Sequence, residues 1–456
     1  MKKVARVGDY IKSPAVPLVI LMGGHFFYLG FLYFANIQGG STLRTGAFFG
    51  LLYLYVFISS WRHWRCLRVQ TVDLLFACFV ILLLLSLMIH ENRGQERYLQ
   101  FLPFFVVFPY LAGRLCSSET IKQFIFGYVW ITWGALILIA PWLLERLNDS
   151  VPPELRPYIF GVGQTSIYAG QLVGGVLTLL VSYLLLQRNW GVLRWAMAGL
   201  MFLLVTSLII LTARGPLMTA LATIAIALAT ASWARPRQRA LMAGWLAACV
   251  VLAIVALPPR YAGFFVQGMS GAVKEVKSDE AYFFALYLHK DRRHIQDQDV
   301  WTEYKGPLQG CITLANKGAA VGSWGARVWL YREALEQFIS SHGRGVGVGG
   351  FGERVCGDSG LSPHSTLLQA FVELGLLGGA AFLAIIVWTT HYLWTALRST
   401  SVGMRAIASL LASLWCFYVL FDQVNGHYLA NAGFFLLTGA CAALRDESSL
   451  KAEQRL

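Results

Sequence analysis

Three basic side chains attract attention, two at the edges of apolar runs and one in a predicted amphipathic helix. His364 falls near the start of SPHSTLLQAFVELGLLGG, which extends over residues 362–379. Arg214 ends another apolar run in LTARGPL, and Arg327 belongs to ARVWLYREAL. A neutral imidazole can accept a proton from a hydroxyl group, and a guanidinium binds phosphate through its planar fork of donors. Together these residue types offer one proton acceptor and two phosphate-binding groups.

The two arginines also have structural explanations that the sequence leaves open. Arg214 is followed by Gly215 and Pro216, and proline suits the first turn of a helix because its missing N–H costs nothing there. Arg214 is therefore expected in a tight hairpin at the membrane surface, where a snorkelling side chain could anchor the helix end. Arg327 could belong to the solvated face of a helix. Either guanidinium could instead bind phosphate.

The residues around His364 predict the protonation state of its ring. Ser362 is the expected N-cap and Pro363 the expected first helical residue, which places His364 in the first turn. The positive end of the helix dipole disfavours a further positive charge there. We therefore expect a neutral imidazole near pH 7, the form that a general base requires. The alternative is a polar interface residue that completes the helix start.

Three further residues are candidates for binding substrate. His342 and Arg344 lie in SSHGRGVGVGG, where His342 could also be only a turn residue. Glu373 lies within the apolar run, and a carboxylate inside a membrane helix is a functional candidate by default. It could equally accept a packing hydrogen bond.

Two kinds of site are excluded by missing patterns. Residues 345–350 match GxGxxG by letter, but a dinucleotide site also needs a strand before them and a helix after them. We predict instead a turn whose glycines let the backbone approach another surface. The sequence has no HExxH, no paired CxxC and no Walker motif. It therefore predicts neither a catalytic metal nor a cofactor.

The elements that hold these residues follow from the composition. The chain has 456 residues, of which 57% are hydrophobic and 13% charged, whereas soluble domains have about 45–50% and about 25%. Apolar runs of roughly 18 or more residues indicate transmembrane helices. The sequence predicts an all-α polytopic membrane protein with twelve spans, at residues 15–36, 45–61, 72–90, 98–113, 121–144, 167–186, 192–212, 216–233, 240–257, 364–392, 404–421 and 428–444.

The basic residues orient these spans. With a cytoplasmic N-terminus, 19 of the 37 Lys and Arg residues fall on inner segments and 6 on short outer loops, as the positive-inside rule requires. We therefore expect both termini in the cytoplasm and the candidate residues on the outer face. The remaining 12 accompany 11 acidic residues in one long outer loop. The net charge of +13 thus reflects orientation toward anionic lipid, not nucleic-acid binding.

Three regions result: nine spans over residues 1–257, an outer loop over 258–363, and three spans with a tail over 364–456. Within the loop, residues 323–341 predict an amphipathic helix, because apolar residues recur at i, i+4 and i+8 in Leu330, Ala334 and Phe338. A second, more loosely patterned helix is expected at 272–288.

The cysteines divide by compartment. Cys311 and Cys356 lie in the outer loop, where the redox conditions permit a disulfide, but sequence alone cannot supply the required geometry. The other cysteines lie in spans or at their inner ends and are expected to be small buried residues.

The order of these motifs resembles the O-antigen ligase family, and more broadly the ligase and polymerase superfamily of bacterial polysaccharide assembly. The matching pieces are LTARGP, ARVWLYREAL, HGRGVGVGGFG and PHSTLLQAFVELGLLGG, of which the last is the most specific. The remaining spans match only in number and hydropathy. Where many relatives have asparagine after the histidine, this chain has Ser365.

The resemblance implies a membrane glycosyltransferase (GT-C-like) architecture of twelve spans in the bacterial inner membrane, with its active site at the periplasmic face. It implies a glycan donor on undecaprenyl diphosphate, an acceptor sugar on lipid A–core, and no need for a metal. Carried over by motif, Arg214 and Arg327 hold the diphosphate and His364 is the catalytic base. One direct displacement then predicts inversion at the anomeric carbon.

Other functions stay open at this point. A polysaccharide polymerase or a protein O-oligosaccharyltransferase of the same superfamily would differ in the acceptor, which the sequence does not resolve. A flippase or transporter of lipid-linked sugars would typically show repeated halves and charges lining a path through the membrane. The predicted spans are almost free of charge at their centres and the polar groups gather at one face, which favours an enzyme. A structural membrane scaffold would not need a histidine at a helix start near arginines.

Overall fold

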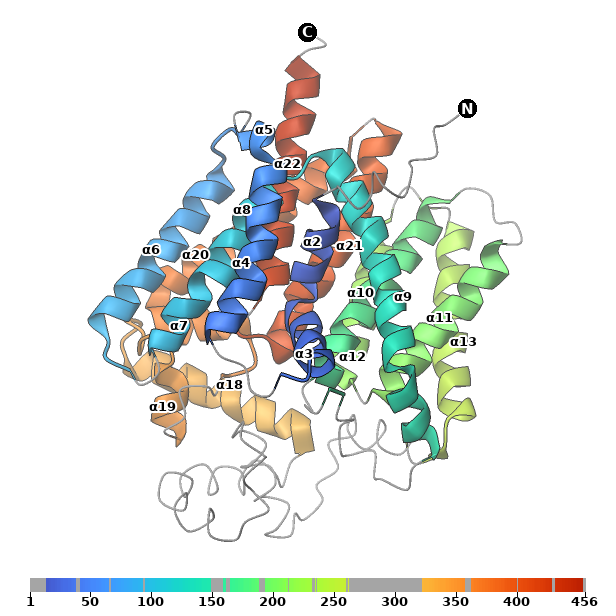
Figure 1. Ribbon diagram of the computed structural model, residues 1–456, viewed down its shortest axis with the longest axis horizontal. Coiled ribbons are helices and arrows are strands. Elements are labelled where there is room, and N and C mark those ends of the chain that lie inside the picture. The colour runs from blue at the N-terminus through green and yellow to red at the C-terminus, as the bar shows by residue number, and fades with distance from the viewer. Residues whose placement is uncertain are drawn as a thin grey trace.

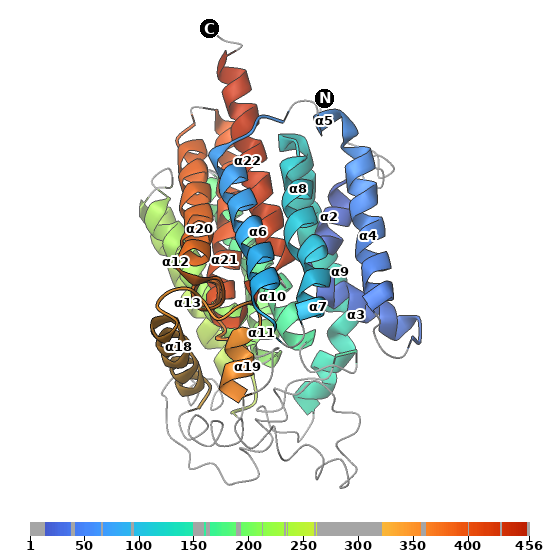
Figure 2. The same ribbon diagram turned by 90° about the vertical axis from the view of Figure 1, so that its left-hand side faces the viewer.

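The computed structural model of the protein describes residues 14–37, 42–64, 67–92, 95–148, 159–160, 165–187, 193–211, 213–231, 234, 236–259, 261, 322–356, 362–399, 401–428 and 431–453 (Figures 1 and 2). Within these ranges there are helices and no β-strand. The helices are α2 (Ala15–Met22), α3 (Gly24–Phe34), α4 (Thr42–Ser59), α5 (Trp61–Trp64), α6 (Thr71–Ile89), α7 (Gln95–Leu102), the π-helix η1 (Pro103–Val107), α8 (Phe108–Arg114), α9 (Ser118–Asn148), α10 (Thr165–Leu186), α11 (Leu193–Ile210), α12 (Arg214–Thr230), α13 (Pro236–Ala256), α18 (Gly322–Ser340), α19 (Gly350–Cys356), α20 (Thr366–Leu397), α21 (Val402–Asn425) and α22 (Ala432–Glu453).

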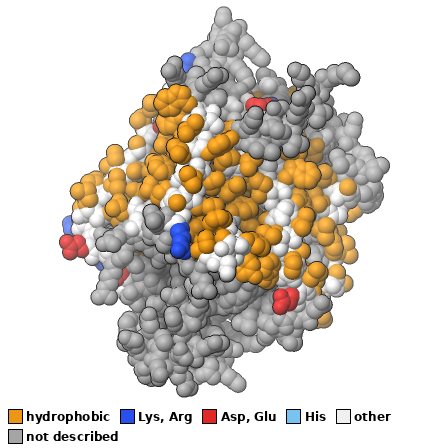
Figure 3. All heavy atoms as spheres, viewed as in Figure 1, with side chains coloured by type: hydrophobic (Ala, Val, Ile, Leu, Met, Phe, Trp, Pro, Cys, Tyr) orange, Lys and Arg blue, Asp and Glu red, His pale blue; other side chains and the backbone are white. Residues whose placement is uncertain are grey.

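The long helices lie side by side in one bundle (Figures 1 and 2). The start of α2 and the end of α22 lie at one end of the bundle, and α18 and α19 lie at the opposite end. We call the end that carries α18 the cap end. Hydrophobic side chains cover much of the face seen in Figure 3, and exposed leucine and isoleucine side chains recur along α4, α6 and α9. A surface of this kind suits lipid and not water.

Each of the twelve predicted spans coincides with one or more helices. Among the described residues, six helices are long and apolar enough to cross a bilayer by themselves, namely α6, α9, α10, α13, α20 and α21. Helices α4, α11 and α12 are apolar but shorter. The structure therefore supports a multi-pass helical membrane protein, and the crossing of all twelve segments stays a prediction.

The first predicted span, residues 15–36, is broken. Helices α2 and α3 meet at an angle of 93°. The break falls at Gly23, where the Phe27 ring occupies the place that a Cβ atom would need. The carbonyl of Gly23 accepts hydrogen bonds from the amides of Phe26 and Phe27. Any larger residue here would require the Phe27 ring to move.

Helix α20 is also interrupted, which corrects the predicted span at 364–392. Gly375 has φ 74° and ψ −170°, far from helical values. Residues 376–397 alone are roughly 33 Å long at 1.5 Å per residue, enough to cross a hydrocarbon core of about 30 Å. Residues 366–374, which we call the outer segment, therefore form a separate helical piece before the span.

Helices α8 and α22 pack closely through glycine. A Cβ atom on Gly113 would clash with the backbone of α22 at Leu436, and one on Gly439 would clash with the backbone of α8 at Tyr110. Small residues that let backbones touch are a common device in membrane helix pairs. The two helices therefore contact each other without intervening side chains.

The same helix pair ends in a buried ion-pair cluster. Arg114 is 4% exposed, and its guanidinium contacts carboxylate oxygens of Asp73 and Asp446 at 2.8 Å each. It also donates to the carbonyl of Arg68 at 2.8 Å. Asp73 in turn accepts the backbone N–H of Gln70 and so caps the start of α6. The cluster joins α6, α8 and α22 at the end of the bundle away from the cap.

The outer loop is described in part. Helix α18 confirms the amphipathic helix predicted at 323–341, because Leu330 and Ala334 are buried and Phe338 packs beside them. The helix expected at 272–288 and Cys311 lie outside the described residues, as does the side chain of Cys356, so the disulfide stays a prediction. Of the other described cysteines, Cys116, Cys249 and Cys441 are buried, whereas Cys78 is exposed on the outward face of α6. Its predicted burial is wrong, because α6 turns that face away from the bundle.

Candidate functional site

The last turn of α21 contacts both the helix start that follows His364 and the helix that carries Arg327. The side-chain oxygen of Gln423 accepts hydrogen bonds from Ser365 Oγ at 2.9 Å and from the backbone N–H of Leu367 at 3.3 Å. Its Nε2 donates to Thr366 Oγ1 at 2.9 Å and to the carbonyl of Val419 at 3.2 Å. One amide therefore fixes the first turn of α20 against α21.

Helix α18 is anchored to the same turn of α21. Arg327 Nε donates to the carbonyl of Val424 at 3.1 Å, and Tyr331 Oη donates to the carbonyl of Gln423 at 2.8 Å. Burial lowers the pKa of the Arg327 guanidinium from its ordinary value, because removal from water disfavours its charge. An anion beside this guanidinium would offset that cost. Arg327 therefore lies between two elements and not on a solvated helix face.

His364 lies one position outside the helix that follows it. The N-cap of α20 is Ser365, whose Oγ accepts a hydrogen bond from Leu368 N at 3.3 Å. The predicted cap at Ser362 and the placement of His364 in the first turn are therefore wrong. His364 has φ 58°, in the left-handed region, and a non-glycine residue there marks a constrained turn.

The shifted cap has two consequences. The helix dipole acts mainly within the first turn, so its effect on the imidazole is weaker than the sequence suggested. Ser365 fulfils the capping role because a serine hydroxyl, like an asparagine side chain, is a preferred N-cap. The partly buried His364 is held between Pro363 and this cap.

Arg214 is the first residue of α12, and Pro216 lies in the first turn as predicted. The start of α12 packs beside α21 through α10: Gly174 lies against both the Pro216 carbonyl and the Phe417 ring. Phe417 precedes Gln423 by about 9 Å along the axis of α21. The first amides of α12 and the guanidinium of Arg214 form an electropositive helix start, a setting that favours an anion.

His342 and Arg344 lie further from His364 along the same structure. Both are exposed and follow the end of α18, and His342 has φ 54°, as residues just past a helix end often do. The segment that carries them, residues 341–349, is called the glycine loop below. It binds near Gly375, at the end of the outer segment opposite to His364, about 12 Å away along that segment.

The glycine loop is attached to α20 by its backbone. The amides of Val346 and Gly347 donate to the carbonyls of Val372 and Glu373, each at 2.9 Å. A Cβ atom on Gly345 would lie 2.5 Å from the amide nitrogen of Gly375. This close approach confirms the predicted role of the glycines. The two amides serve α20, so they are not placed to hold a pyrophosphate.

Glu373 holds the end of this loop. Its side chain is 1% exposed and accepts hydrogen bonds from Tyr428 Oη at 2.7 Å, from Gln369 Nε2 at 3.3 Å, and from the backbone amides of Gly349 and Phe351. Four donors occupy a carboxylate with about four acceptor positions. Of the two interpretations left open by the sequence, the geometry favours the packing acceptor over the substrate ligand.

Sequence reasoning missed two polar residues at the end of α21. Gln423 makes the contacts described above, and Asp422 beside it is 2% exposed. Its Oδ2 atom has no hydrogen-bond partner among the described residues. A buried carboxylate is a usual partner for imidazole and guanidinium groups. The signal was present in FDQVN, where two polar residues directly follow an apolar span.

Comparisons of the sequence with protein-family models and with curated proteins find no match. The functional argument therefore depends on the geometry above. Arg327 and the cap beside His364 are held to one turn of α21, and Arg214 begins a helix whose start lies across α10 from Phe417, about 9 Å along α21 from that turn. His342, Arg344 and Glu373 belong to the attachment of the glycine loop.

Proposed function

We propose that the protein is a membrane glycosyltransferase of the O-antigen ligase type. It would transfer a glycan from undecaprenyl diphosphate to a sugar hydroxyl of lipid A–core at the periplasmic face of the inner membrane. The observation that carries the proposal is the shared anchoring of two candidate residues. Gln423 binds the cap that follows His364, while the carbonyls of Gln423 and Val424 bind the helix that carries Arg327.

Two guanidiniums and a helix start provide the electrostatics for this reaction. The bond between the anomeric carbon and the diphosphate oxygen breaks, and the leaving diphosphate gains negative charge. Arg327 is partly desolvated and Arg214 is the first residue of α12, at the positive end of that helix's dipole, so both favour an anion. Fixed positive groups of this kind can each supply about 3–4 kcal/mol of transition-state stabilisation.

His364 would supply the proton acceptor. The acceptor hydroxyl loses its proton to the imidazole as its oxygen bonds to the anomeric carbon from the face opposite the diphosphate. A positioned base typically contributes about 10²–10⁴-fold. A single displacement without a covalent enzyme intermediate inverts the anomeric configuration. The constrained backbone at His364 keeps the ring at a defined place relative to the outer segment.

The test uses purified protein, an undecaprenyl-diphosphate glycan and lipid A–core in the presence of EDTA. The natural protein should form the ligated product, and His364→Ala should lose about 10²-fold or more. His391→Ala is the matched control, because His391 is an exposed histidine within α20, far from the outer segment.

Each contrary result has a defined meaning. Equal activity of His364→Ala and His391→Ala rejects the assigned base. A requirement for divalent metal rejects the mechanism. Growth of the lipid-linked glycan without lipid A–core identifies a polymerase, and transfer to serine or threonine of a protein identifies a protein O-oligosaccharyltransferase. Movement of the lipid-linked donor across the vesicle membrane without any glycan transfer identifies a flippase.

A further inference from the structure

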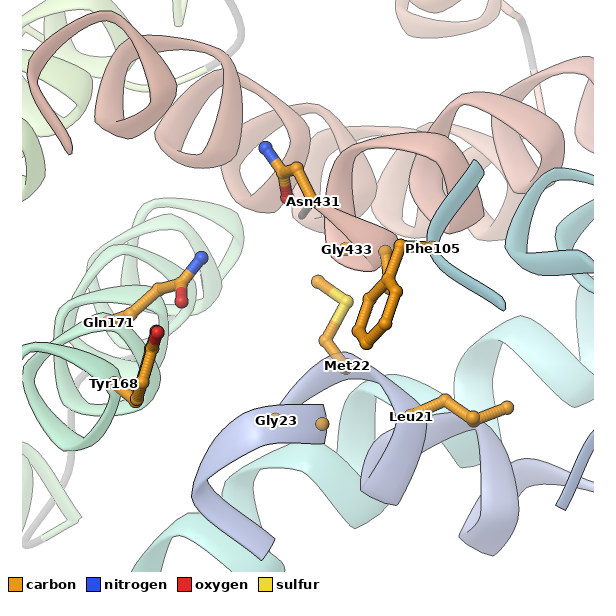
Figure 4. A pocket seen from close by; sticks show the side chains of 10 residues that line it. Leu21, Met22, Gly23, Phe105, Tyr168, Gln171, Asn431 and Gly433 are labelled. Atoms are coloured by element: carbon orange, nitrogen blue, oxygen red, sulfur yellow. The ribbon is translucent and has the colours of Figure 1, made fainter. Parts of the chain in front are cut away.

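A small cavity lies between α2, α3, η1, α10 and the start of α22, and none of the three candidate residues lines it. It is lined by Leu21, Met22, Gly23, Gly24, Phe105, Tyr168, Gln171, Asn431, Ala432 and Gly433. Figure 4 shows Met22 and Phe105 beside one another, with Gln171 and Tyr168 on α10 across from them. Met22, Phe105 and Gln171 all belong to predicted spans. The cavity therefore lies among predicted spans.

Three irregular pieces of backbone converge on this cavity. One is the break between α2 and α3 at Gly23, and the second is the π-helix η1, which contributes Phe105. The third is the start of α22 at Asn431. In a membrane, irregular backbone is tolerated where it is buried in protein or lines a cavity. Broken helices and π-segments are also frequent at binding sites.

A hydrogen bond from α4 stabilises the irregular backbone of the π-helix. The carbonyl of Phe104 accepts a hydrogen bond from the buried Tyr53 Oη of α4 at 2.7 Å. This bond gives the Phe104 carbonyl a donor in a segment whose backbone does not follow the α-helical hydrogen-bond pattern. The distorted segment is therefore a fixed part of the fold that holds Phe105 at the cavity.

The polar groups around the cavity are uncharged. Among the ten described residues that line it, Gln171, Asn431 and Tyr168 carry polar side chains and none is ionised at neutral pH. Asn431 is 7% exposed. Its Oδ1 caps α22 by accepting from Phe434 N at 3.1 Å, and its Nδ2 has no hydrogen-bond partner among the described residues. Such a buried donor is unfavourable unless an acceptor reaches it.

We propose that this cavity binds the uncharged, hydrogen-bonding end of a membrane lipid. Leu21, Met22 and Phe105 accept the apolar part, and the amides of Gln171 and Asn431 bind a hydroxyl or ester oxygen. An ionised headgroup is disfavoured, because no opposite charge lines the cavity to offset its desolvation. A hydroxyl of a long-chain alcohol and the ester or hydroxyl of a monoacylglycerol share the required chemistry.

Photocrosslinking in lipid nanodiscs tests the site directly. The probe is a long-chain alcohol with a diazirine next to its hydroxyl end, and labelled peptides are identified by mass spectrometry. We expect labels on the segments around residues 21–24, 105 and 431–433. Gln171→Leu should reduce them about two- to tenfold, the equivalent of one neutral hydrogen bond. Thr230→Val is the matched control, because Thr230 is an exposed polar residue at the far end of α12 that bonds within its own helix.

Competition on the unmodified protein gives a result that does not depend on how a variant folds. Unlabelled octadecanol and monoolein should both displace the probe, and the stronger competitor identifies the source of the oxygen. Octadecane should not displace the probe, and neither should oleate at pH 9. Equal displacement by octadecane shows an apolar surface only, and equal displacement by oleate rejects the uncharged ligand. Labelling that Gln171→Leu leaves unchanged also overturns the proposal. These outcomes measure binding, so they are independent of the proposed transfer reaction.

Discussion

Replacing Gln423 with leucine should separate catalysis from donor binding. The substitution removes four hydrogen bonds, two accepted from Ser365 and Leu367 and two donated to Thr366 and Val419. At about 0.5–1.5 kcal/mol each, with partial replacement by water, the loss is about 2–4 kcal/mol. This free energy holds the first turn of α20 in place. The carbonyl that binds Tyr331 belongs to the backbone and remains.

The consequence differs between the two halves of the proposed site. The His364 side should shift, and a displacement of about 1 Å can cost about 10²-fold in rate. The Arg327 side keeps its backbone partners, so the KM for the lipid-diphosphate donor should change little. We therefore expect kcat to fall about 10²-fold at nearly constant donor KM, measured by initial rates over a donor titration.

Gln238→Leu is the matched control for this experiment. Gln238 Nε2 also bonds to a helix end, at the carbonyls of Leu184 and Gln187, but those carbonyls lie at the end of α10, away from the outer segment. Its loss should lower the melting temperature comparably and leave kcat of the folded protein unchanged. If both variants lose kcat in proportion to stability, or if Gln423→Leu retains kcat, the positioning role is refuted.

Two further substitutions test the supporting structure. Glu373→Gln places an amide N–H₂ among the donors of Tyr428 and the glycine loop. The melting temperature should therefore fall by the equivalent of about 1–3 kcal/mol for each unsatisfied group. Unchanged stability with a raised substrate KM would instead make Glu373 a ligand. Arg114→Met strands the carboxylates of Asp73 and Asp446, which should cost about 3–5 kcal/mol. Restored stability in the triple variant with Asp73→Asn and Asp446→Asn would confirm the cause, whereas a loss of kcat at full stability would contradict it.

Hydropathy located the helices because an apolar run of this length has few alternatives to a helix in a bilayer. It could not locate the interruptions. Gly375 lies in ELGLLGG, which is uniformly apolar after the glutamate, and its non-helical conformation depends on a tertiary contact with the glycine loop. Gly23 is similar, because its break is fixed by the way the Phe27 ring packs. A local sequence pattern does not reveal contacts between segments that are distant in the chain.

The candidate site was predicted in its residue types more than in its geometry. Ser362 and Ser365 are both good caps by type, and the structure shows that Ser365 caps the helix and also bonds to Gln423. The predicted span at 404–421 ends just before Asp422 and Gln423, and no role is predicted for either residue from the sequence, although polar residues at that edge are where an outer-face site must be built. The placement of α18 followed from its apolar repeat, but its anchoring to carbonyls of α21 has no sequence signature.

The glycine contact between α8 and α22 limits how the molecule can move. With backbone against backbone, the two helices cannot slide or roll past one another, so they behave as a single rigid strut. The strut is clamped by the ion-pair cluster at one end and borders the small cavity at the other. A bulky amphiphile must therefore arrive by displacing softer parts of the molecule. The contact of α18 with the outer segment is softer than this backbone contact, because one small apolar cluster forms it.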